Sequence, residues 1–140
     1  MIFNGVDLAA RFRSDAGGYF LVNAVRGREA MPEELEVLAI PGRAGGVIAS
    51  SRRPVRILEV EITLKGDDRQ DLRKKIEDLN ALLYTNEEVP IEFADEPDRV
   101  YYGRFSGTAY KREVGRIYQA VLTFICPDPY KYGPELEAIF

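Results

Sequence analysis

The sequence contains no histidine, no tryptophan and only one cysteine, Cys126. The absence of histidine excludes Ser-His-Asp and Cys-His nucleophile pairs, histidine metal sites and the commonest general base. A single cysteine excludes an internal disulfide and a cysteine-based zinc site. Because Cys126 ends an apolar strand pattern, a buried and inert thiol is expected. We therefore expect a protein that is not an enzyme and that holds no cofactor or metal.

Long apolar runs are also missing. No run approaches the ~18 residues that a membrane span needs. The start, MIFNGVDLAARFRSDAGG, lacks the basic-then-apolar order of a signal peptide. The 140 residues suit one domain, and 46% apolar with 30% charged residues is ordinary for a soluble globular fold. These features predict an intracellular, unexported chain with no membrane partner.

The net charge of −4 is unevenly distributed. The segment from Val37 to Leu58 contains no acid, and its arginines are Arg43, Arg52, Arg53 and Arg56. Two acidic clusters lie outside it, and they consist of Glu33, Glu34 and Glu36, and of Glu87, Glu88, Glu92, Asp95, Glu96 and Asp98. A basic segment on an acidic body suits a partner of complementary charge, and a second copy of the same chain would qualify.

Hydrophobic periodicity predicts strands on both sides of a single helix. Residues 57–66, ILEVEITLKG, alternate apolar and polar side chains, as expected for a strand with one buried face. Residues 67–84 change to the helical period, with apolar side chains at Leu72, Ile76, Leu79 and Leu83. Asp67 or Asp68 can cap a helix over about 67–83.

The remaining strands are expected over residues 19–25, 34–40, 89–93, 99–110 and 117–126. Long runs joined by short turns favour an antiparallel meander. The predicted fold is mainly β: sandwich-like antiparallel sheets with one packed α-helix, or α+β by strict count. We expect the domain to cover residues 1–128. Three prolines lie within residues 127–134, and residues 129–140 are expected to form an exit segment or linker.

The segment PGRAGGVIASSRRP, residues 41–54, raises the question of phosphate or nucleic-acid binding. A phosphate-binding loop needs Gly-Lys-Ser/Thr at the start of a helix, whereas this segment has no such triplet and leads into a strand. The pI of about 5.0 and the lack of a reader motif argue against nucleic acid. A mobile loop or an extended β-arm with a solvated basic face is the favoured interpretation.

Two other features carry weaker signals. The acids of FADEPDRV, residues 93–100, do not fit the EF-hand pattern, and acids in such a turn are usually turn formers. An enzyme would need a cleft that gathers carboxylates such as Glu92 and Asp95. Among the eight tyrosines, Tyr101 and Tyr118 are candidates for the core. Tyr130 and Tyr132 lie outside the strands and favour contact with a partner.

Several segments, taken in order, resemble the N-terminal domain of the distal tail proteins of siphophages. They are IPGRAGG (40–46), VEITLKG (60–66) with its helix, PIEFADEPDRVYYGRFSG (90–107) and FICPDPYKYG (124–133). The family's loop usually reads Gly-Arg-Asp-Gly, and here Ala44 stands in place of the aspartate. Many members of the family carry a second, carbohydrate-binding-like domain after the last of these motifs.

The resemblance implies a structural protein of a phage or prophage virion, made in the bacterial host cytoplasm and placed at the tail tip. Six copies would form a ring that joins the tail tube protein to the tip hub or tail-associated protein, with DNA passing through without sequence-specific binding. The predicted interface residues are Arg43, Arg52, Arg53, Arg56, Tyr130 and Tyr132. The alternative is a monomeric carbohydrate- or nucleic-acid-binding β-domain.

Overall fold

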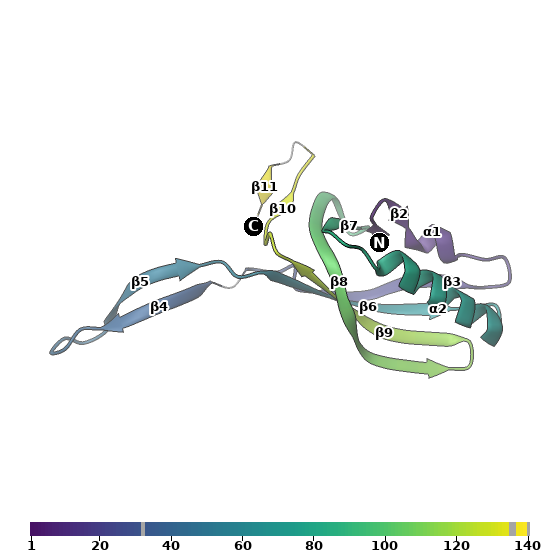
Figure 1. Ribbon diagram of the computed structural model, residues 1–140, viewed down its shortest axis with the longest axis horizontal. Coiled ribbons are helices and arrows are strands. Elements are labelled where there is room, and N and C mark those ends of the chain that lie inside the picture. The colour runs from purple at the N-terminus through teal and green to yellow at the C-terminus, as the bar shows by residue number, and fades with distance from the viewer. Residues whose placement is uncertain (32, 135–136, 140) are drawn as a thin grey trace.

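A computed structural model of the chain describes residues 1–31, 33–134 and 137–139. Pro32 and parts of the predicted exit segment, at 135–136 and 140, lie outside the described residues. The fold is mainly β, as predicted, and antiparallel pairing joins the strands throughout the described region. Figure 1 shows a body of strands and helices from which one long hairpin projects.

The strands of the body follow one path of hydrogen-bonded neighbours, β2-β1-β7-β8-β9-β6-β3. Their bounds are β1 Ile2–Phe3, β2 Val6–Asp7, β3 Tyr19–Arg26, β6 Arg56–Lys65, β7 Val89–Phe93, β8 Glu96–Val114 and β9 Ile117–Cys126. The long strand β8 pairs with β7 over its first part and with β9 over its second. The two halves of the path therefore share β8 and face each other across one core.

The core is where the two halves meet. Phe3 on β1 and Phe124 on β9 have ring centroids 5.5 Å apart. The alternation predicted for residues 57–66 is confirmed, because Leu58, Val60, Ile62 and Leu64 are all fully buried. Cys126 and Tyr101 are buried as expected, and Tyr118 packs against the same cluster.

The predicted helix is present as α2, Arg69–Leu83. Asp68 is its N-cap and accepts a hydrogen bond from the backbone N–H of Asp71. Three of the four predicted apolar side chains are buried and Ile76 packs against the core at its margin. Burial of this stripe stabilises the helix far more than its intrinsic propensity does.

The expectation of a single helix was wrong, because a second helix, α1, spans Leu8–Phe12. Asp7 caps it by accepting hydrogen bonds from the N–H groups of Ala9 and Ala10. Leu8 and Phe12 are buried. Five residues are too few to produce a periodic pattern that a sequence window can detect.

After β9 the chain adds two short strands, β10 Lys131–Tyr132 and β11 Ala138–Ile139. Tyr132 of β10 pairs with Val100 of β8, so the beginning of the predicted exit segment lies against the body. Across residues 1–31, 33–134 and 137–139, no helix is long and apolar enough to cross a membrane.

Replacing Leu79 with aspartate tests the helix and its packing. Leu79 is 2% exposed, so the variant places a carboxylate in the core without a partner. We expect a loss of about 4 kcal/mol or more and no cooperative melting transition at 25–60 °C, measured by circular dichroism. The control is Asn80→Asp, one residue further along and exposed, which should melt nearly as the wild type does. An undiminished transition in Leu79→Asp would contradict the packing described here.

Candidate functional site

The projecting hairpin, residues 33–53, is here called the arm. It consists of β4, Glu34–Ala39, and β5, Gly46–Arg52, which pair with each other in a sheet of their own. Every residue of both strands is exposed to solvent. The segment 41–54 is thus part of an extended β-arm, one of the two forms that its sequence favoured. The arm points away from the body and shares none of its core (Figure 1).

The arm ends in a tight turn. Pro41 and Gly42 occupy its central positions, and the N–H of Arg43 donates to the carbonyl of Ile40 at 3.1 Å. Gly42 has φ +80°, the left-handed conformation that the third residue of a type II turn requires and that glycine adopts without strain. Arg43 stands directly after this turn and has no ion-pair partner among the residues that the structure describes.

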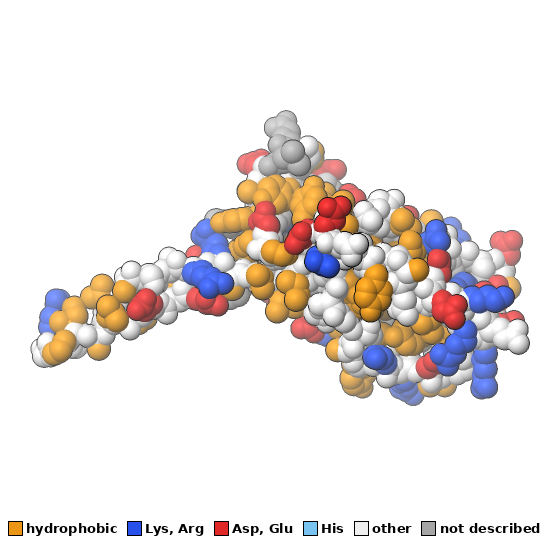
Figure 2. Space-filling view, viewed as in Figure 1, with side chains coloured by type: hydrophobic (Ala, Val, Ile, Leu, Met, Phe, Trp, Pro, Cys, Tyr) orange, Lys and Arg blue, Asp and Glu red, His pale blue; other side chains and the backbone are white. Residues whose placement is uncertain are grey.

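Apolar side chains cover much of the arm. Val37 is 63% exposed and Ile48 is 60% exposed, and the two are cross-strand partners. Leu35, Leu38 and Val47 are about half exposed. Figure 2 shows hydrophobic side chains along the arm and basic ones at its far end and near its base. Exposed apolar groups on this scale mark an interaction surface or an aggregation risk.

The two arginines at the base of the arm interact within their own chain. Arg52 lies 3.9 Å from a carboxylate oxygen of Glu34, and both side chains are largely exposed, so this ion pair contributes little. Arg53 approaches Glu33 at 3.2 Å and donates to the hydroxyl of Tyr130 at 2.9 Å. Its guanidinium also lies over the Tyr130 ring, 5.9 Å from the centroid.

Arg56 has a different setting from the other predicted interface arginines. It is 5% exposed, and its guanidinium donates to the carbonyls of Gly27 at 2.6 Å and Pro129 at 2.8 Å. The guanidinium carbon lies 5.5 Å from the centroid of the Tyr101 ring. Arg56 lies just after the arm in the chain. Within one subunit it thus links Gly27, which precedes the arm, to Pro129, which follows β9.

A polar cluster lies next to Arg56 and Tyr101, and Glu96 is at its centre. The carboxylate of Glu96 accepts hydrogen bonds from the Tyr101 hydroxyl, at 2.8 Å, and from the Lys131 ammonium. Arg28 lies 3.7 Å from Glu96 and forms a two-bond ion pair with Asp95, at 2.7 and 2.9 Å. Burial alone would raise the pKa of Glu96, but the bonds from Lys131 and Tyr101 and the neighbouring cations outweigh it and lower the pKa.

The predicted contact tyrosines lie beside the body. The backbone N–H of Tyr130 donates to the carboxylate of Asp128 at 3.1 Å. Tyr132 donates its hydroxyl to the same carboxylate, and this bond raises the pKa of Tyr132. The Tyr132 ring meets Tyr102 edge-on, with centroids 5.8 Å apart. Tyr132 thereby connects the exit segment to β8.

The pKa shifts of Asp95, Cys126 and Tyr101 do not favour acid–base or nucleophilic chemistry at neutral pH. The hydrogen bonds from Arg28 lower the pKa of Asp95, so this carboxylate is held ionised and is a poor general acid. Burial raises the pKa of the Cys126 thiol to about 11, which keeps it protonated and inert at neutral pH. Burial also raises the pKa of Tyr101.

The sequence matches the phage tail protein family with a RIFT-related domain over residues 16–126. The chain belongs to this family. It is 43% identical over 137 residues to the distal tail protein of Bacillus phage SPP1. The matched region covers 97% of this chain and 51% of that protein. The resemblance stated from the sequence is confirmed.

Solved structures give the same result. The crystal structure of the SPP1 Dit protein, described as a paradigm of the hub adsorption apparatus of phages that infect Gram-positive hosts, superposes with a TM-score of 0.81. The match has 42% identity and covers 95% of this chain and 51% of that one. The family domain described here therefore spans about half the length of the relative that it matches.

Sequence reasoning missed the cluster around Glu96, which was interpreted only as part of an acidic turn. One signal was available for Arg56. It stands two residues before Leu58 in an alternating strand, so its side chain shares the inward face with Leu58 and Val60. No local pattern points to Lys131 as the partner of Glu96, because the two are 35 residues apart.

Glu96 predicts a pH dependence of stability. Its pKa is lowered in the folded state, so its contribution is present above the unfolded value of about 4.5 and is lost as the pH falls through the lower folded pKa. We expect Glu96→Gln to cost about 1–3 kcal/mol at pH 7 and to flatten the loss of stability between about pH 5 and pH 3. Urea unfolding across that range measures both effects.

The matched control is Glu87→Gln, which neutralises an exposed carboxylate outside the cluster. It should leave the pH profile of the wild type unchanged. If Glu96→Gln and Glu87→Gln gave the same profile, the cluster would not contribute to acid sensitivity.

Proposed function

We propose that this chain is a structural ring component of a phage or prophage tail tip, and that its arm binds a neighbouring copy. Six copies would close into a ring that joins the tail tube to the tip hub and the receptor-binding apparatus. The observation that carries the proposal is the arm: a fully exposed, apolar hairpin on a domain of the distal tail family.

The physical argument begins with the hairpin's own stability. Two strands in isolation are at best marginally stable in water, because they have no second layer against which to bury side chains. The arm nevertheless carries five large apolar side chains that are about half exposed or more. Covering Val37 and Ile48 alone would contribute several kcal/mol at about 1.5–3 kcal/mol per side chain. A second subunit supplies the missing layer.

Arm length supports a head-to-tail arrangement. From residue 34 to residue 43 an extended chain spans about 30 Å, at about 3.3 Å per residue. That length is close to the diameter of a small domain. An arm that reaches one subunit further, and binds a surface different from itself, makes a heterologous contact, and such contacts close into rings when the rotation allows it.

The finer parts of the proposal rest on the family. The relative from phage SPP1 is a distal tail protein described as part of a hub adsorption apparatus, and this supports a place at the tail tip beside a hub. The tail tube as the other neighbour is part of the proposal. The central opening of such a ring would let DNA pass without sequence-specific contact. The role is structural and not enzymatic, in keeping with the absence of histidine. As a component of a phage virion, the protein would be synthesised in the cytoplasm of the bacterial host.

Of the predicted interface residues, we propose that Arg43 and Arg52 contact the neighbour. Arg53 and Tyr130 pack on each other at the base of the arm. A neighbour that binds there would contact the two side chains as a pair. Arg56 is enclosed by its own chain, and its role is to hold the arm in place. Tyr132 remains a candidate for contact beside β8.

Replacing the exposed pair on the arm tests the proposal. The variant Val37→Ser/Ile48→Ser removes apolar area from the arm without touching the core. We expect the wild-type chain to form a species of about six times 15.8 kDa and the variant to need a concentration about 30-fold higher or more to assemble. Light scattering coupled to size exclusion across a concentration series measures both.

A matched pair provides the control. Val114 and Ile117 are also an exposed Val–Ile cross-strand pair, at the end of the β8–β9 hairpin. Val114→Ser/Ile117→Ser should assemble as the wild type does. A wild-type chain that stays monomeric at every concentration would overturn the ring and favour the monomeric binding domain. Equal weakening by both variants would show that the arm has no special part in assembly.

A further inference from the structure

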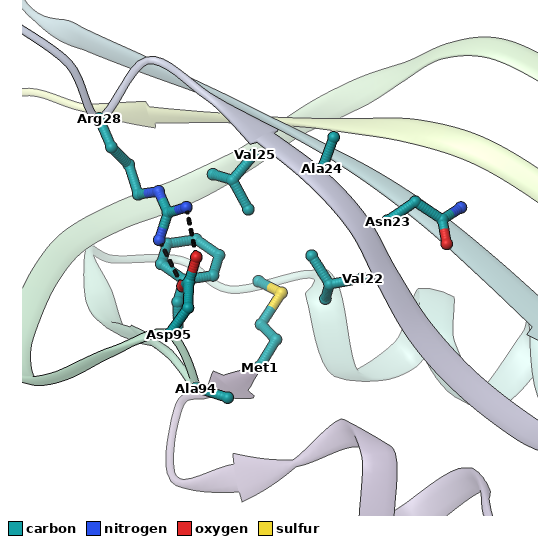
Figure 3. A pocket seen from close by; sticks show the side chains of 9 residues that line it. Met1, Val22, Asn23, Ala24, Val25, Arg28, Ala94 and Asp95 are labelled. Atoms are coloured by element: carbon teal, nitrogen blue, oxygen red, sulfur yellow. Dashed lines mark hydrogen bonds and ion pairs between the residues drawn. The ribbon is translucent and has the colours of Figure 1, made fainter.

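The body has an apolar groove around the turn that joins β7 to β8, here called the turn groove. Two adjoining hollows form it, with volumes of about 270 and 390 Å³. Met1, Phe93 and Ala94 line both hollows and form their common boundary. Figure 3 shows the first hollow, where Met1, Val22 and Val25 face a common space and Arg28 reaches Asp95 across it.

The walls of the turn groove are acidic. Carboxylates that line it are those of Asp7, Glu92, Asp95, Glu96 and Asp98. The cationic groups nearby are the guanidinium of Arg28, which is bound to Asp95, the ammonium of Lys131, which is bound to Glu96, and the amino group of Met1. Glu92 and Asp98 have no side-chain ion pair with any other residue that the structure describes. The groove therefore offers an apolar floor and unneutralised negative charge.

The tip of the arm has the complementary character. From residue 37 to residue 51 the only charged side chain is that of Arg43, and the tip also carries Ile40, Pro41 and Val47. Arg43 lies in an exposed turn and lacks an ion-pair partner within the described part of the chain. An apolar, singly cationic tip matches an apolar, anionic groove in both properties.

Other hollows on the surface do not match. One is lined by Arg69 and Arg73, another by Arg112, and a third by Arg52 and Arg53 at the base of the arm. In each of these three hollows the lining arginines outnumber the lining carboxylates, which disfavours Arg43, whereas in the turn groove the carboxylates outnumber Arg28. Charge therefore selects the turn groove from among these hollows.

We infer that the turn groove receives the arm tip of a second copy of this chain, with Arg43 directed to Glu92 and Asp98. The inference deepens the ring proposed above and rests on it, since it names the surface on which the neighbour's arm docks. The groove and the tip lie on different parts of one chain, so each subunit offers one of each, and the contact repeats around a closed ring.

Disulfide trapping tests the inference directly. Ala44 stands at the tip next to Arg43, and Ala94 is exposed at the junction of the two hollows. The only native thiol, Cys126, is fully buried and does not interfere. Under mild oxidation, the Ala44→Cys/Ala94→Cys protein should give a ladder of covalent multimers, up to the complete ring, on a non-reducing gel. The control pair, Ala44→Cys/Glu88→Cys, places the second thiol on an exposed site outside the groove and should give no ladder.

The outcomes separate this inference from the ring itself, because the mass of the reduced protein is measured in parallel. A ring-sized mass without a ladder would overturn the groove and leave the ring standing. Cross-linking that stops at dimers would retain the groove but contradict the ring. A monomeric mass with no ladder would overturn both.

A charge variant provides a second measurement. Glu92→Gln/Asp98→Asn removes the two carboxylates while conserving shape, and asparagine suits the positive φ of 62° at position 98. We expect the concentration needed for assembly to rise about threefold to tenfold at low salt, with a smaller effect at high salt. Glu87→Gln/Glu88→Gln makes the same change in net charge outside the groove and should have no effect. Equal behaviour of the two variants would contradict the role of the groove acids.

Discussion

The arm is constrained by the fact that a two-stranded hairpin has no interior. Every side chain of β4 and β5 meets water in the isolated subunit, including Val37 and Ile48. The core of the body contains no residue of the arm, so the body does not cover these side chains. The isolated subunit therefore leaves the apolar side chains of the arm uncovered. The proposed ring and the proposed docking groove both follow from this constraint.

Arg56 links the chain on the N-terminal side of the arm to the segment after β9. A buried guanidinium is costly unless its donors are satisfied. Here Nε donates to the carbonyl of Pro129 and Nη1 to that of Gly27, whereas Nη2 has no hydrogen-bond partner among the residues that the structure describes. Gly27 itself requires glycine, because its φ is +97° and an added Cβ would lie 2.0 Å from the carbonyl oxygen of Ile57. Arg56 therefore contributes, together with Arg53 and Tyr130, to holding the base of the arm against the segment after β9.

The sequence predicted those elements in which apolar side chains recur at the regular spacing of a strand or a helix. Leu58 and Leu72 belong to patterns whose spacing reflects burial directly, so the strand and the helix were found. The helix α1 was missed because five residues contain little more than one turn. The cluster at Glu96 was missed because its partners, Arg28 and Lys131, come from distant parts of the chain. The interface assignment of Arg56 treated all four arginines as one basic surface, whereas strand parity directs this one inward.

Amide hydrogen exchange of the arm, followed by mass spectrometry as the protein is diluted, tests the central claim most directly. The account predicts that peptides covering residues 33–53 are protected in the assembled species and exchange rapidly when dilution releases monomers. Peptides from β6 and β9 in the core should stay protected throughout and serve as an internal reference. If the arm exchanged as rapidly in the assembled species as in the monomer, no second subunit would cover it, and the account would be contradicted.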